Sequence, residues 1–180
     1  MKPFLTILSV LSLALCGCSS ARNAEPATTA GGSSEATTET GPPPLTPDER
    51  TWLAAIPRLH GRVDKPFRAS QLNLTRTKME QLGRALSRCQ DGLRRLGQST
   101  DRLEPVYELV AKACKRYTKG ARCFSEAARL SDASGSVVAG TEEAKMRDRR
   151  LSCGFAAQGN ASNLMANAEA KAEAIKTEIG

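Results

Sequence analysis

The chain has 180 residues, a formal net charge of +7, only 4% aromatic residues, six cysteines and a single histidine, His60. Any arrangement of a nucleophile and an imidazole base would therefore have to use His60. The sequence also lacks a glycine-rich phosphate loop, a Gly-x-Ser-x-Gly motif and a His-Glu-x-x-His motif. We therefore predict that the protein is not an enzyme and uses no cofactor, and we expect His60 to be solvated or lightly packed.

The first 17 residues have the organisation of a secretory signal peptide. Lys2 precedes an apolar run from Phe4 to Leu15, and small residues follow it. This run has 12 residues, whereas a helix that spans a bilayer needs about 20. We therefore predict that residues 1–17 direct export and do not span the membrane.

The segment Leu15-Cys16-Gly17-Cys18 resembles the lipobox of bacterial lipoproteins, in which a branched apolar residue and two small residues precede the modified cysteine. The resemblance implies cleavage after Gly17 and acylation of Cys18, for example with palmitate. It also implies that the protein is anchored at the extracytoplasmic face of a bacterial membrane. Ser19, rather than Asp, follows the cysteine, so nothing favours retention at an inner membrane. The alternative is an ordinary signal peptide that is removed together with Cys16 and Cys18.

Residues 18–46 are predicted to form a disordered tether behind the lipidated cysteine. They are rich in Ser, Thr, Pro and Gly, and Leu45 is their only large apolar residue. Such a segment buries too little apolar surface to offset its chain entropy. As a flexible coil, residues 19–46 would span about 30 Å on average.

Residues 47–180 are predicted to form one helical domain, since strand patterns are almost absent. Thr46 as N-cap, Pro47 at the first helical position and Glu49 two residues later form a capping box that starts a helix. Pro57 and Gly61 indicate that this first helix is short, kinked or broken. Its apolar face consists of Trp52, Ile56, Leu59 and Val63.

Three longer helices are predicted from apolar residues at three- and four-residue spacing. The second ends at Gly97, the third starts near Asp101, and the fourth runs from about Thr141 to near Ile179 after a loop at 131–140. The predicted fold class is all-α, a small antiparallel up-down bundle of three long helices and a short first one. The stripe of the second helix consists of Leu72, Met79, Leu82, Leu86, Cys89, Leu93 and Leu96. The third helix contributes Leu103, Val110, Tyr117 and Phe124, and the fourth contributes Ala161, Met165, Ala168, Ala172 and Ile175.

Four cysteines, an even number, lie in the predicted helical domain outside the cytoplasm, where disulfides form. Residues that face each other across a hairpin are centred on its turn, which favours Cys89–Cys114 and Cys123–Cys153. The crossed pairing, Cys89–Cys123 with Cys114–Cys153, is the alternative. Cys114 and Cys123 cannot pair, because nine residues of helix separate them by about 13 Å. The sequence has no Cys-x-x-Cys pair, so we predict no metal site.

Positive charge is concentrated between Arg50 and Arg129, which include 18 Lys or Arg and 7 Asp or Glu. Solvated charge is one interpretation; the other is contact with lipid headgroups, an anionic wall polymer or an acidic envelope protein. Nucleic acid fits the charge but not the predicted compartment. The predicted basic contact face consists of Arg84, Arg88, Arg95, Lys112, Lys115, Arg116 and Lys119.

The sequence thus favours a lipid-anchored, non-enzymatic module of the cell envelope that binds through this basic face. A second hypothesis is a carrier of a small ligand in a pocket between helices. Its lining would consist of Tyr107, Tyr117, Phe124 and Met165. A third hypothesis is an enzyme inhibitor or adaptor with one stoichiometric protein partner.

Overall fold

The computed structural model describes residues 41–69 and 74–179, which form four helices and contain no strand. They are α1 (Pro47–Ala69), α2 (Arg76–Leu96), α3 (Glu104–Arg129) and α4 (Glu142–Ile179). The predicted signal peptide, Cys18, most of the tether and Leu72 lie outside the described residues, so the statements about them stay predictions. None of the described helices is both long and apolar enough to cross a membrane.

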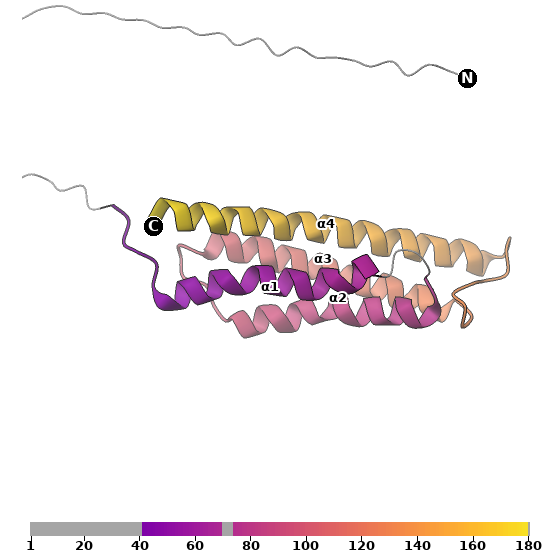
Figure 1. Cartoon of the computed structure of the whole chain (residues 1–180). Helices are drawn as coiled ribbons and strands as arrows, with labels where there is room; N and C mark the ends of the chain where they lie inside the picture. The colour runs from indigo at the N-terminus through magenta and orange to yellow at the C-terminus, as the bar shows by residue number, and fades with distance from the viewer. Residues whose placement is uncertain (1–40, 70–73, 180) are drawn as a thin grey trace, which may run out of the picture. The chain divides into compact units, whose positions relative to one another are not determined.

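Successive helices run in opposite directions, and α3 packs against both α2 and α4 (Figure 1). This arrangement confirms the predicted all-α antiparallel bundle. Short connections between neighbouring helices favour this topology, because each helix can bury its apolar face against the next one along the chain. The weakest packing in the bundle is that of α1, which contacts α2 and α4.

The core follows the predicted stripes. Leu103, Val110, Tyr117 and Phe124 lie seven residues apart on α3 and are at most 1% exposed. Small residues on α4 allow that helix to approach closely, and a Cβ atom added at Gly154 would lie 2.9 Å from the ring of Phe124. The buried side chains between the helices therefore include both large residues of α3 and small residues of α4.

The first helix differs from its prediction. It is an unbroken helix of 23 residues, longer than the 21 residues of α2, although Pro57 and Pro66 lie inside it. A proline inside a helix costs about 3 kcal/mol. Buried apolar residues on both sides of Pro57, such as Leu53 and Val63, offset this cost because they can face α2 and α4 only if the helix continues.

The helical domain includes the last residues of the predicted tether. Leu45 is only 9% exposed, and Arg102 donates a hydrogen bond of 2.9 Å to the carbonyl of Pro43. The predicted capping box is confirmed: the backbone N–H of Thr46 donates to Glu49 (2.9 Å), and that of Glu49 donates to the Thr46 hydroxyl (3.2 Å). Residues 43–46 therefore belong to the helical domain.

Glu49 also connects α1 to the turn between α2 and α3. Its carboxylate is 6% exposed and accepts a hydrogen bond of 2.7 Å from the hydroxyl of Thr100. The pKa of Glu49 is lowered, first by the backbone hydrogen bond from Thr46 and then by the bond from Thr100. Because the folded state favours the ionised carboxylate, Glu49 stabilises the fold above its unfolded pKa, and this contribution is lost as the pH falls through its folded pKa.

We expect Glu49→Ala to lower the free energy of unfolding by about 1–2 kcal/mol at pH 7, because the cap and the bond from Thr100 are both lost. Urea unfolding followed by circular dichroism measures this. The difference from the native chain should shrink as the pH falls below the ordinary pKa of a glutamate, about 4.3, and become small only below the lowered pKa of the folded state. Glu143→Ala is the matched control, since Glu143 is an exposed residue in the first turn of α4. Equal losses in the two variants would contradict the structural role of Glu49.

Both predicted disulfides are present. Cys89–Cys114 joins α2 to α3 with the Cα atoms 5.2 Å apart, and Cys123–Cys153 joins α3 to α4 with the Cα atoms 6.0 Å apart. Disulfides form and persist in oxidising compartments, so these two bonds are consistent with a location outside the cytoplasm.

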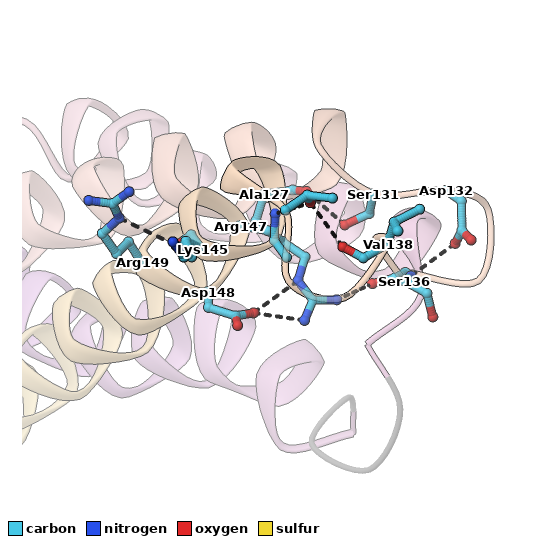
Figure 2. A network of polar contacts seen from close by, with 12 residues as sticks. Ala127, Ser131, Asp132, Ser136, Val138, Lys145, Arg147, Asp148 and Arg149 are labelled. Carbon is cyan, nitrogen blue, oxygen red and sulfur yellow. Dashed lines mark hydrogen bonds and ion pairs between the residues drawn. The ribbon is translucent and has the colours of Figure 1, made fainter.

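A polar network orders the connection from α3 to α4 (Figure 2). The carboxylate of Asp132 accepts hydrogen bonds from the Ser134 hydroxyl (2.6 Å) and the Ser136 amide (2.9 Å), which lower its pKa. Arg147 of α4 reaches back and donates a hydrogen bond of 2.7 Å to the carbonyl of Gly135. These bonds connect residues 132–136 with one another and with α4, although the segment is rich in Ser and Gly.

Candidate functional site

The seven residues of the predicted basic face are exposed, and those that line grooves are divided among several. Arg84 lies beside α3, whereas Arg88 and Arg95 line a groove on the α1 side of α2, together with Arg62. Lys112 forms an ion pair of 2.9 Å with Glu108. The predicted basic face therefore stays a prediction, although its α2 residues are divided between two grooves.

Two adjoining grooves on the outer side of α3 bring together a different set of cations. One groove lies towards α2, the other towards α4, and Thr118, Arg122 and Glu126 line both. We call the two grooves together the α3 groove. Glu126 is its one carboxylate, and it forms an ion pair of 2.8 Å with Arg150. The cations that line it are Arg84, Lys115, Lys119, Arg122, Arg129 and Arg150.

The helix period places these cations together. Lys115, Arg122 and Arg129 are seven residues apart, as are the core residues Val110, Tyr117 and Phe124. Both sets therefore form stripes along α3, the apolar one towards the core and the basic one towards solvent. Lys115 and Arg129 lie about 21 Å apart along the helix axis. None of the three basic residues forms an ion pair within the described part of the chain.

A second polar site lies between α1 and α4. We expected His60 to be solvated or lightly packed. Instead, its side chain is only 13% exposed and both ring nitrogens have partners. Its Nδ1 lies 2.9 Å from Oε1 of Glu169, and its Nε2 lies 3.2 Å from Oγ of Ser162. Both partners come from α4, seven residues apart and therefore on the same side of that helix.

Buried polar groups extend this site towards α3. Asp64 of α1 accepts a hydrogen bond of 2.9 Å from the amide of Gln158 and forms an ion pair of 2.5 Å with Arg68. The hydroxyl of Tyr117 is buried and has no hydrogen-bond partner among the described residues. Burial, and then the negative charges of Asp64 and Glu169, raise the pKa of Tyr117. A buried hydroxyl without a hydrogen-bond partner costs about 1–3 kcal/mol, so its presence in the core calls for an explanation.

The residues proposed for a carrier pocket are mostly part of the core. Tyr117, Phe124 and Met165 are fully buried, and the partly buried Tyr107 contacts Trp52 with 6.5 Å between ring centroids. These side chains fill the space between the helices. Across residues 41–69 and 74–179, no group of three or more His, Cys, Asp or Glu residues is arranged to hold a metal ion.

We did not identify several of these residues as parts of a site from the sequence alone. The seven-residue spacing of Lys115, Arg122 and Arg129 is a signal that could have identified the basic stripe. No local pattern connects His60 with Ser162 and Glu169, which lie more than a hundred residues further along the chain. No protein-family model, curated protein or solved structure matches this chain.

Proposed function

We propose that this protein is a lipid-anchored extracytoplasmic module that binds an anionic polymer of the bacterial cell envelope through the α3 groove. The observation that carries the proposal is the lining of this groove, which has six cations and a single carboxylate. The two disulfides and the lipobox resemblance support the compartment. The predicted anchor on Cys18 would keep the groove close to the membrane.

The arrangement of the cations favours an extended anion over a compact one. Neighbouring members of the basic stripe, such as Lys115 and Arg122, are about 10 Å apart along α3. A single lipid headgroup can reach one or two of them, whereas a linear polyanion that follows the helix can contact all three. Four of the six cations are arginines, which stay charged and bind phosphate or carboxylate through two parallel hydrogen bonds.

The full-length protein, purified in detergent, tests this proposal with immobilised polyphosphate as the probe. We expect the variant K115Q/R122Q/R129Q to bind more weakly than the native protein. The slope of log affinity against log salt concentration should become less steep by about 2–3, because binding with three fewer cationic contacts releases fewer counterions from the polymer. Far-UV circular dichroism should be unchanged, because the three side chains are exposed.

The matched control is R62Q/R88Q/R95Q, which removes the same charge from the groove between α1 and α2. This control should keep most of the affinity and the native salt slope. Equal weakening in both triple variants would mean that only net charge matters and would refute a specific α3 groove. Crosslinking in intact host cells distinguishes an adaptor, which would yield one stoichiometric protein instead of polymer.

A further inference from the structure

The site between α1 and α4 has an ordered chain of contacts from a hydroxyl through an imidazole to a carboxylate. Ser162 Oγ lies 3.2 Å from one ring nitrogen of His60, and Glu169 Oε1 lies 2.9 Å from the other. A serine nucleophile, a histidine base and a carboxylate that orients the histidine are connected in this order in serine hydrolases, on several unrelated folds. Turning the imidazole over would exchange its two nitrogens and leave the order of the three groups unchanged.

The buried hydroxyl of Tyr117 is a second, independent observation at the same place. It is enclosed by the helices near Asp64, Ser162 and Glu169; it makes no hydrogen bond of good geometry with a described residue, although the Ser162 hydroxyl is close enough to lower its pKa. Like any tyrosine, it is protonated at neutral pH and can act as a donor.

The imidazole of His60 is also accessible. Glu169 is 31% exposed, and His60 forms part of the lining of a surface groove with Pro57 and Gly61. A Cβ atom added at Gly61 would have no atom within 4 Å, so the groove is open there. A small molecule can thus approach the imidazole from the α1 side.

We propose that Ser162, His60 and Glu169 form a site that hydrolyses a small carboxylic ester, with Ser162 as the nucleophile and His60 as the general base. Glu169 is a positioning residue that orients the imidazole. Tyr117 donates a hydrogen bond to the oxygen that becomes negatively charged. This activity is separate from the α3 groove and does not depend on it.

In the first half of the reaction, Ser162 Oγ bonds to the carbonyl carbon of the ester while His60 takes the serine proton. The bond from this carbon to the alcohol oxygen then breaks, and His60 gives its proton to the departing alcohol. In the second half, water attacks the acylated Ser162 with His60 again as base. The serine regains its proton and the carboxylic acid is released. No oxidant or reductant is needed.

The rate should be modest. Ser162 lies inside α4, where the backbone N–H groups are engaged in the helix. Tyr117 is the donor assigned to the oxyanion, and a single such donor is typically worth about 10²–10³ in rate. Covalent trapping is therefore a more sensitive readout than turnover.

The test uses a fluorophosphonate probe on the full-length protein in detergent, with peptide mapping by mass spectrometry. Ser162 should be labelled in the native chain. His60→Gln should slow labelling at least 100-fold, and Glu169→Gln should slow it at least tenfold. Ser152→Ala is the matched control, an exposed serine on the same helix whose loss should change nothing. Labelling no faster than the background of Ser162→Ala would overturn the proposal.

Tyr117→Phe separates catalysis from folding. The substitution removes only the unpaired hydroxyl, so the thermal midpoint should stay the same or rise. The rate of 4-nitrophenyl acetate hydrolysis should fall at least tenfold. An unchanged hydrolysis rate, or a lower thermal midpoint with no loss of rate, would refute the role of Tyr117 and contradict the proposed site. Neither result bears on polyphosphate binding by the α3 groove, whose residues are distinct.

Discussion

Replacing Cys89 and Cys114 together by alanine is expected to lower the free energy of unfolding by about 3–4 kcal/mol. The bond closes a loop with a sequence separation of 25 residues, and the chain-entropy model assigns this much to a loop of that length. Both cysteines are fully buried, so alanine keeps the site apolar while it removes the constraint on the unfolded chain. Guanidinium unfolding followed by circular dichroism measures the loss.

The second disulfide should contribute a similar amount, since Cys123 and Cys153 are separated by 30 residues. The two loops do not overlap along the chain, so their contributions should add to about 7 kcal/mol. This is comparable to the whole stability of a typical domain, about 5–15 kcal/mol. Each double alanine variant should therefore stay folded, whereas reduction of both bonds should unfold most of the protein. A reduced chain with native helicity and an unchanged midpoint would contradict this prediction.

The helices and the disulfides could be predicted because their determinants are local or depend only on turn positions. Gly97 ends α2 with a positive φ of 74°, as the sequence indicates, and the core stripe of α3 keeps its seven-residue spacing from Leu103 to Phe124. Once the turns are placed, antiparallel geometry brings Cys89 close to Cys114. Periodicity and turn chemistry thus determine both the elements and their neighbours.

The α1 helix and the two polar sites could not be predicted in this way. The continuity of α1 through Pro57 depends on burial against α2 and α4, which outweighs the local preference. The partners of His60 depend on the rotation of α1 about its own axis relative to α4, and no local pattern encodes that angle. Similarly, Arg84 and Arg88 are four residues apart on one face of α2, yet Arg84 lines the groove towards α3 and Arg88 the groove towards α1.

Gly135→Ala is expected to destabilise the protein by about 3 kcal/mol, although the residue lies in a loop. Its φ is +90°, which costs other residues about 1–2 kcal/mol. In addition, a Cβ atom at this position would lie 2.0 Å from the carbonyl oxygen of Leu74, immediately before α2. Because the obstacle is backbone, either this loop or the start of α2 must move, and such overpacking costs about 1–3 kcal/mol.

Gly140→Ala isolates the backbone contribution. Gly140 lies in the same loop with a φ of +82°, but no atom lies within 4 Å of its added Cβ. This variant should lose only that contribution, about 1–2 kcal/mol. The difference between the two variants, measured by urea unfolding, therefore reports the contact between the loop and Leu74. Movement of the loop would also disturb the bond from Arg147 to the Gly135 carbonyl, so the start of α4 should lose protection from hydrogen exchange in Gly135→Ala alone. Equal losses of stability in the two variants would mean that the loop does not pack against the start of α2 in solution.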